Sequence, residues 1–148
     1  MLQRFEQVLA QADFVVLACP LNDSTKGLIS RALLGKMKAS AYLINVARGA
    51  VVDQQALVEA LTEKRLAGAA LDVFTQQPLP VDSPLYGMEN VLLSPHMAGV
   101  TDDSLRAMGG SVARQARQIL GGQLPDHLVN HESASQVQQH LARQLGKS

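Results

Sequence analysis

The sequence predicts an α/β fold built on a parallel sheet, and three observations indicate this class. Short apolar runs with strand character alternate with amphipathic segments that have helical spacing. Most of these runs are apolar without alternation, which is typical of strands buried between helices. Hydrophobic residues make up 47% of the chain and aromatic residues only 3%. A length of 148 residues suits one domain or a large part of one.

Charge and cysteine content exclude several classes of function. The 13 basic and 13 acidic residues give zero formal net charge, so we expect neither nucleic acid nor a membrane surface as a partner. The single cysteine, Cys19, excludes an internal disulfide and a cysteine-based metal cluster, and it favours a reducing, cytoplasmic setting. We expect no metal. No signal-peptide pattern opens the chain, and no apolar run approaches the ~20 residues needed to span a bilayer.

The first part of the chain predicts two helices and two strands. The first dozen residues repeat apolar side chains at helical spacing and predict a short amphipathic helix. Residues 14–19 form an uninterrupted apolar run ended by Pro20, which predicts a central parallel strand. Ser30 is the expected N-cap of a short helix reaching Met37, and residues 41–46 form the second strand.

The alternation continues through the middle of the chain. Asp53 is the expected N-cap of a helix with one apolar stripe, and residues 67–74 form a third strand directly after it. Prolines and Gly87 mark a long irregular crossover before residues 91–94, the fourth strand. The helix stripe consists of Ala56, Leu57, Ala60 and Leu61.

A long helix and a tail complete the chain. Thr101 is expected to begin the helix, and Gly121 followed by Gly122 is expected to end it. We expect residues 1–130 to form the sheet domain and residues 131–148 a tail whose weak amphipathic pattern allows a docked helix. The long helix carries a stripe that should face inward, made of Leu105, Met108, Val112, Ala116, Ile119 and Leu120.

One feature of a dinucleotide-binding sheet is missing. No strand is followed by Gly-x-Gly-x-x-Gly, the turn that cradles a pyrophosphate, and Gly109 with Gly110 lies inside a predicted helix. The fold class is therefore a Rossmann-like half-domain of four strands flanked by helices, without the first βαβ unit and its glycine fingerprint.

Arg48 directly follows the second strand, at the edge of a parallel sheet where ligands bind. A planar guanidinium suits a carboxylate and a carbonyl through paired charge-assisted hydrogen bonds. Position alone leaves open a surface or capping role for this arginine.

Three segments at successive strand ends carry a family resemblance: Asn45-Val46-Ala47-Arg48-Gly49, Ala70-Leu71-Asp72-Val73-Phe74 and Ser94-Pro95-His96-Met97-Ala98-Gly99. In this order they resemble the C-terminal half of the NAD-binding domain of the D-isomer-specific 2-hydroxyacid dehydrogenases, over roughly residues 13–130. The resemblance implies an oxidoreductase that interconverts small 2-keto and D-2-hydroxy acids, with NAD or NADP as the cofactor.

The resemblance also implies roles for single residues. Arg48 would hold the substrate, and His96 would donate the proton, for which an imidazole suits neutral pH. Asp72 would face the nicotinamide, although it could simply cap a strand end, and His96 by itself could be an ordinary loop histidine. The cofactor cleft would be lined by Cys19, Val46, Ala47, Arg48, Asp72, His96, Met97, Ala98 and Gly99. Cys19 reads equally well as a small buried hydrophobic residue.

Gln77 departs from the family pattern, which usually has a glutamate before this proline. A glutamine can orient the imidazole of His96 by a hydrogen bond but cannot stabilise its protonated form by charge. The proton donor should therefore be weaker above neutral pH. Glutamine here also resembles the NAD-dependent formate dehydrogenases, whose product needs no proton, and this reaction is the alternative chemistry.

The larger departure concerns what precedes Phe14 in the family: a substrate domain and the first βαβ half, neither of which this chain contains. We expect a truncated chain that binds cofactor weakly alone, because the helix N-terminus that holds the pyrophosphate is missing. The competing class is a non-catalytic remnant that self-associates, or that pairs with a separate N-terminal half through an exposed sheet edge.

Overall fold

A computed structural model describes residues 2–144 and 146, which form two compact units divided between Ala98 and Gly99. The first unit contains the sheet, and the second contains the long helix and the tail. The predicted domain 1–130 thus extends over both units. Among the described residues, no helix is long and apolar enough to cross a membrane.

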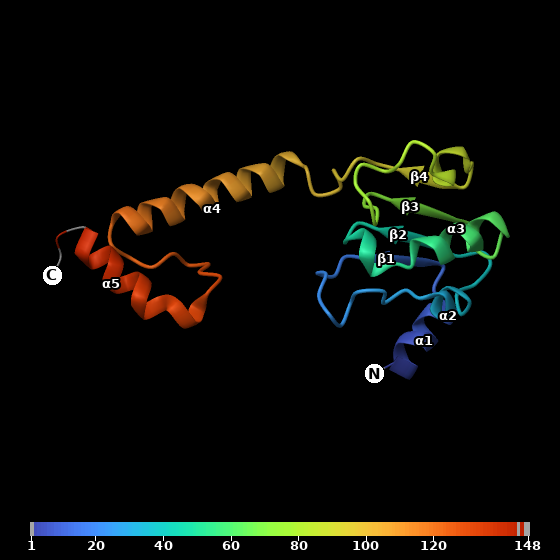
Figure 1. The fold of residues 1–148 in the computed structure, drawn as a ribbon, viewed down its shortest axis with the longest axis horizontal. Helices are drawn as coiled ribbons and strands as arrows, with labels where there is room; N and C mark the ends of the chain where they lie inside the picture. Colours follow the sequence, from blue (N-terminus) through green and yellow to red (C-terminus); the bar gives the residue numbers. More distant parts are fainter. Residues whose placement is uncertain (1, 145, 147–148) are drawn as a thin grey trace. The chain divides into compact units, whose positions relative to one another are not determined.

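The first unit is built on a four-stranded sheet with the order β1-β2-β3-β4, in which every neighbouring pair is parallel (Figure 1). This topology confirms the predicted α/β class. The register aligns Leu17 with Asn45 and Asn45 with Leu71, so the carboxyl ends of the strands meet along one edge. The strands are β1 (Phe14–Leu17), β2 (Tyr42–Asn45), β3 (Gly68–Leu71) and β4 (Val91–Leu93).

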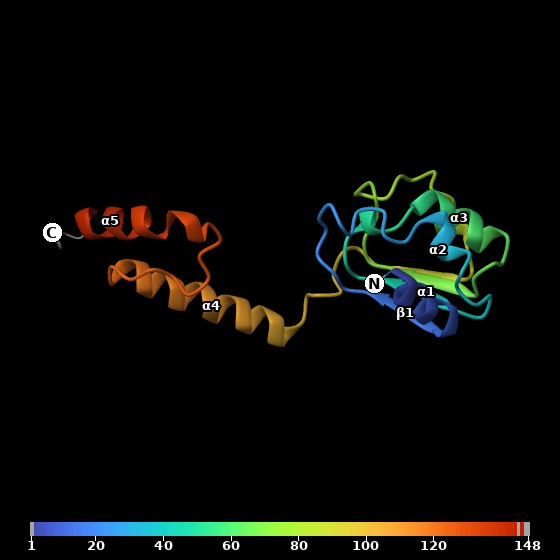
Figure 2. The ribbon, with the colours of Figure 1, turned by 90° about the horizontal axis from the view of Figure 1, so that it is seen from below.

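The core of this unit lies between the sheet and its helices. The helices are α1 (Leu2–Gln11), α2 (Arg31–Leu34) and α3 (Gln54–Thr62), with the 3₁₀ turns η1 (Gly49–Val51) and η2 (Pro84–Gly87). Figure 2 shows α2 and α3 on one side of the strands. Asp53 caps α3 as predicted, because its Oδ1 accepts a hydrogen bond from the backbone N–H of Ala56 at 3.1 Å. All four residues of the predicted α3 stripe are buried.

One face of the sheet remains open within the first unit. Residues 14–19 predict a central strand, but β1 covers only residues 14–17 and is an edge strand of the described sheet, so that prediction is wrong for the described residues. Phe14 is 65% exposed and Val16 58% exposed. The ring of Phe14 stacks on Tyr42 with 5.6 Å between ring centroids. An apolar run indicates two covered faces but does not say which segment covers them.

The second unit consists of α4 (Asp102–Leu120), the 3₁₀ turn η3 (His131–Ser133) and α5 (Ala134–Gln144). Thr101 begins α4 as predicted, with a reciprocal capping box to Ser104. The tail is helical in α5, whose Val137 and Leu141 are half-buried. The Gln138 side chain donates a hydrogen bond to the carbonyl of Gly122 at 2.9 Å.

The expected inward orientation of the α4 stripe is wrong for this unit. Leu105 is 52% exposed and Val112 68% exposed. The half-buried residues of α4 are polar ones on a different face: Ser104, Ser111, Gln115 and Gln118. An apolar stripe therefore lies open, because the helical period predicts which residues share a face but not what that face contacts.

Candidate active site

The residues that the sequence singles out gather at the carboxyl edge of the sheet in the first unit. Arg48 follows β2, Asp72 follows β3 directly, and His96 lies two residues beyond Ser94, which follows β4. Gln77 belongs to the irregular segment after β3. Parallel register brings these ends together, as the topological rule for α/β sheets requires.

Arg48 leaves the sheet through a turn that Asn45 holds. The side chain of Asn45 is buried, with 1% exposed; its Oδ1 accepts from the backbone N–H of Ala47 at 3.0 Å, and its Nδ2 donates to the carbonyl of Arg48 at 3.1 Å. The Arg48 side chain is exposed, and its Nη1 donates to the Ala47 carbonyl at 2.6 Å. The turn thus fixes the backbone and leaves most guanidinium donors open to a ligand.

Gly49 packs the Arg48 turn against the segment that leads to Gln77. A Cβ atom at Gly49 would lie 1.9 Å from the carbonyl carbon of Phe74, so no other residue fits without a backbone shift. Gln54 adds a second tie, because its side-chain Oε1 accepts from the backbone N–H of Thr75 at 2.9 Å. The segments after β2 and β3 are therefore held together.

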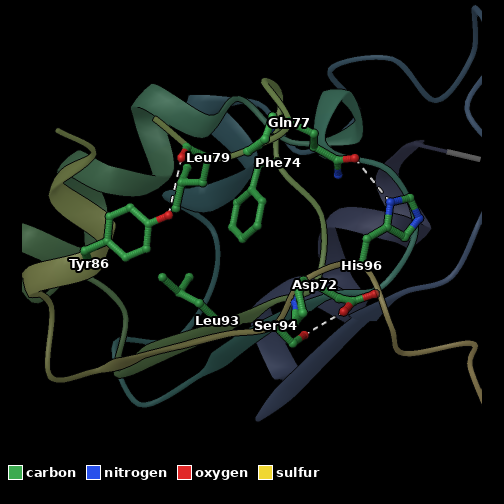
Figure 3. Close-up of a pocket in the computed structure, with 10 residues that line it drawn as sticks. Asp72, Phe74, Gln77, Leu79, Tyr86, Leu93, Ser94 and His96 are labelled. Carbon is green, nitrogen blue, oxygen red and sulfur yellow. Dashed lines mark hydrogen bonds between the residues drawn. The ribbon is translucent and has the colours of Figure 1, made fainter. Parts of the chain in front are cut away.

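Gln77 and His96 lie side by side at the rim of this edge. Oε1 of Gln77 is 3.2 Å from Nδ1 of His96 (Figure 3). With a carbonyl oxygen as the contacting atom, Nδ1 carries the hydrogen and donates it, an assignment that follows from the hydrogen-bond pattern. The other ring nitrogen, Nε2, points away from Gln77 and is free to face a substrate (Figure 3).

Asp72 lies beneath the turn that carries His96 and is only 4% exposed. It accepts hydrogen bonds from Ser94 Oγ at 2.6 Å, from the backbone N–H of Met97 at 2.8 Å and from that of Ala98 at 3.0 Å. Burial alone would raise the pKa of Asp72, but these hydrogen bonds, with the charge of nearby His96, outweigh it and lower the pKa below its usual value.

A cavity of about 610 Å³ adjoins the Gln77 and His96 side chains (Figure 3). Most of its wall is apolar, and its polar members include Asp72 and Ser94. The wall is formed by Asp72, Phe74, Gln77, Pro78, Leu79, Tyr86, Leu93, Ser94, Pro95 and His96. The pair therefore borders apolar surface on one side and solvent on the other.

The remaining residues expected around the cofactor differ in exposure. Val46 is 37% and Met97 54% exposed, whereas Ala47 is buried and Cys19 packs half-buried against the core. Gly99 belongs to the second unit, where its carbonyl accepts from Ser104 Oγ at 2.6 Å. Their roles at a cofactor stay predictions.

The sequence reasoning gave no role to Asn45 and Ser94, although both stand in the quoted segments. A polar residue at the end of an apolar strand run is the signal that could have identified them. Among the described residues, no hydrogen bond or ion pair joins Arg48 to Gln77 or His96, so the substrate itself would have to connect them.

This edge, with a fixed arginine turn and a paired histidine on a half Rossmann-like sheet, has the arrangement of the α/β proteins that bind ligands at the carboxyl ends of their strands. Residues 1–98 match the family described as D-isomer specific 2-hydroxyacid dehydrogenase, NAD binding domain. The chain belongs to this family.

Individual relatives agree with the family. A glyoxylate reductase from Thermofilum pendens is 47% identical over 127 residues, which are 86% of this chain and 38% of that protein. The solved structure of a D-isomer specific 2-hydroxyacid dehydrogenase from Xanthobacter autotrophicus Py2, in complex with NADPH and MES, is 38% identical with a TM-score of 0.76. The match covers 90% of this chain and 54% of the Xanthobacter chain. A third, from Lactobacillus delbrueckii in its NAD complexed form, is 37% identical with a TM-score of 0.76, over 84% of this chain and 42% of that one. The chain spans well under two thirds of the length of each relative.

Proposed function

We propose that this chain supplies the substrate-binding arginine and the proton donor of an NAD(P)-dependent reductase of small 2-keto acids. The observation that carries the proposal is the 3.2 Å contact between Gln77 and His96 at the carboxyl edge of the sheet. It engages one nitrogen of the imidazole and leaves the other for a substrate. The similarity to a glyoxylate reductase supports glyoxylate as the first substrate to try.

Arg48 binds the substrate in this proposal. Its Nη1 is occupied by the Ala47 carbonyl, and the remaining guanidinium donors can reach a carboxylate and the adjacent carbonyl oxygen. A planar fork fixes the plane of the 2-keto acid as well as its position. The buried side chain of Asn45 keeps the turn in place while the ligand binds.

His96 delivers the proton to the carbonyl oxygen as that oxygen gains charge. Because Gln77 engages Nδ1, Nε2 is the nitrogen that donates, and it does so from the protonated ring. Gln77 acts as a positioning residue that holds the ring plane. Its amide adds no charge that would stabilise the protonated ring.

The residues at this edge fit one end of NAD(P). Val46 and Met97 offer apolar surface that would suit the nicotinamide ring, and the reduced cofactor would supply a hydride there. No described strand leads into a Gly-x-Gly-x-x-Gly turn, so the described residues offer no cradle for the pyrophosphate. The proposal therefore needs a second polypeptide segment that supplies this turn.

The open sheet face and the β1 edge support such a segment. Val16 and Phe14 are exposed on one face of β1; a parallel strand beside β1 would pair with its open edge, and a helix joined to that strand would cover these side chains. The occupant proposed here is the N-terminal half of the same NAD-binding domain, and a second copy of this chain is the alternative. The free Cys19 thiol fits a cytoplasmic setting for this assembly.

Substitution in an assembled protein tests the proposal. The chain is combined with the part of the Thermofilum pendens glyoxylate reductase that it does not match, and glyoxylate-dependent oxidation of NADH and NADPH is followed. His96→Asn should lower kcat by about 10²-fold or more, because asparagine keeps the turn but cannot donate the proton. Arg48→Lys should raise KM for glyoxylate. His127→Asn, an exposed histidine of the second unit, is the matched control.

An unchanged kcat in the His96→Asn variant would contradict the assigned role. The neutral Gln77 also favours one second candidate, the oxidation of formate, because carbon dioxide leaves without a proton. Reduction of NAD⁺ with formate, together with no turnover of glyoxylate in the same assembly, would replace the 2-keto acid proposal with this one.

A further inference from the structure

We infer that Asp72 is a positioning residue that holds the His96 turn in its working conformation, rather than primarily a ligand of the cofactor. The inference rests on the proposed function of His96 and deepens it. It follows from the backbone conformation of His96, the burial of Asp72 and the way its acceptor positions are occupied.

His96 adopts a backbone conformation that needs support. Its φ is +59°, in the left-handed region, which is uncommon for residues other than glycine although asparagine, aspartate and histidine enter it more often than most. Such a conformation persists only where the surroundings determine it, and it is common at functional sites. The side chain of His96 is exposed, so packing around it cannot provide that support.

The hydrogen bonds to Asp72 bracket His96 on both sides. Ser94 Oγ donates from two residues before it, and the backbone N–H groups of Met97 and Ala98 donate from directly after it. The backbone N–H of Ser94 also donates to the carbonyl of Leu71 at 3.0 Å, which anchors the start of the turn on β3. The turn is therefore tied to the end of β3 at each of its two ends.

The acceptor positions of Asp72 are largely taken. Oδ1 accepts from both Ser94 Oγ and Met97 N, which fills its two lone pairs, and Oδ2 accepts from Ala98 N. With 4% of the residue exposed, one position on Oδ2 at most is left for a ligand. Hydrogen bonds from backbone N–H groups to a buried carboxylate are stronger than those between neutral groups, so these contacts can hold a strained turn.

Hydrogen exchange on the full chain without cofactor tests the inference. In Asp72→Asn, an amide replaces one acceptor oxygen, and neither orientation of that amide can accept from Ser94, Met97 and Ala98 together. Because one of the two turn amides loses its acceptor in either orientation, we expect the amide hydrogen of Met97, of Ala98 or of both to exchange at least about tenfold faster in the variant. The amide of Ser94, bonded to Leu71, should exchange at its original rate.

Asp53→Asn is the matched control, because it removes another carboxylate of the same unit that accepts a backbone N–H, that of Ala56. It should leave the exchange of Met97 and Ala98 unchanged. If Asp72→Asn fails to fold, scalar couplings across the hydrogen bonds decide in the unaltered chain: couplings from the Met97 and Ala98 amides to the Asp72 carboxyl carbon are expected.

Unchanged exchange at Met97 and Ala98 in a folded Asp72→Asn variant, or absent couplings in the unaltered chain, would overturn the inference. A residue that serves only as a cofactor ligand gives this result, because no cofactor is in the sample. Neither readout requires turnover, so a failure of the proposed reductase activity would be seen separately in the assembled protein.

Discussion

The side chain of Gln77 carries no charge, and this determines how the proposed proton donor responds to pH. In the assembled protein, Gln77→Glu should shift the pH range of glyoxylate reduction toward higher pH, because a carboxylate near Nδ1 stabilises the imidazolium by charge, an effect that solvent weakens at this exposed site. Asp72, which also interacts with His96, is unchanged in this variant. Glyoxylate-dependent oxidation of NADH at several pH values measures the shift.

Gln76→Glu is the matched control for that substitution. Gln76 precedes Gln77 and is also exposed, and the structure gives it no contact with His96. It adds the same charge without the hydrogen bond. An equal shift in both variants would mean that charge alone acts, and that the Gln77 contact does not orient the ring.

Asp72 should make the stability of the first unit depend on acidity. Its pKa is lower in the folded chain, so its contribution is fully present above the unfolded value of ~3.9 and is lost as the pH falls through the lower folded value. We expect Asp72→Asn to reduce the free energy of unfolding by about 2 kcal/mol at neutral pH. The difference in free energy of unfolding between the unaltered chain and the Asp72→Asn variant should shrink below about pH 4. Urea unfolding at several pH values measures it, and a constant difference would contradict the account.

Much of the candidate site could be predicted at the residue scale. Arg48 was singled out by its strand-end position and His96 and Gln77 by the resemblance to the family, and the structure places Gln77 beside His96. The use of the Asp72 carboxylate by Ser94 and the turn amides could not be predicted, because it depends on the path of the backbone after β4. The buried role of Asn45 was missed for the same reason.

At the scale of elements, Gly49 is the point where the segments after β2 and β3 meet. Gly49→Ala places a Cβ within 2.1 Å of the Phe74 carbonyl oxygen, so the backbone must shift. We expect a loss of about 2–4 kcal/mol in the free energy of unfolding, as for other substitutions that overfill a packed contact. Gly87→Ala is the control, because nothing lies within 4 Å of its added Cβ. Thermal unfolding measures both variants. An equal loss in the free energy of unfolding for Gly49→Ala and Gly87→Ala would contradict the packing argument.

The elements themselves could be predicted far better than their surroundings. All four strands, the Asp53 cap of α3 and the Thr101 cap of α4 follow from local patterns, and the structure confirms them. The patterns failed for β1 and for the α4 stripe, since an apolar face in the sequence does not identify the segment that covers it. Val16 on β1 and Val112 on α4 are exposed for this reason.

For the molecule as a whole, the open face of the sheet predicts association. We expect the chain alone to elute as a species larger than a monomer, because exposed apolar side chains on β1 favour contact with another copy. Val16→Lys should shift the chain toward the monomer in size-exclusion chromatography with light scattering. Val81→Lys is the control, since Val81 is 95% exposed on a loop away from the strands. A clean monomer of the unaltered chain would argue against an interface on this face.

The central claim is that this chain contributes Arg48 and His96 to a site that it does not complete alone. Glyoxylate-dependent oxidation of NADH, measured for the chain alone and for the chain assembled with the unmatched part of the Thermofilum pendens glyoxylate reductase, tests it most directly. The account predicts no turnover above background for the chain alone, and turnover in the assembly that His96→Asn lowers by about 10²-fold or more. Micromolar binding of NADH with turnover of glyoxylate by the chain alone would contradict it.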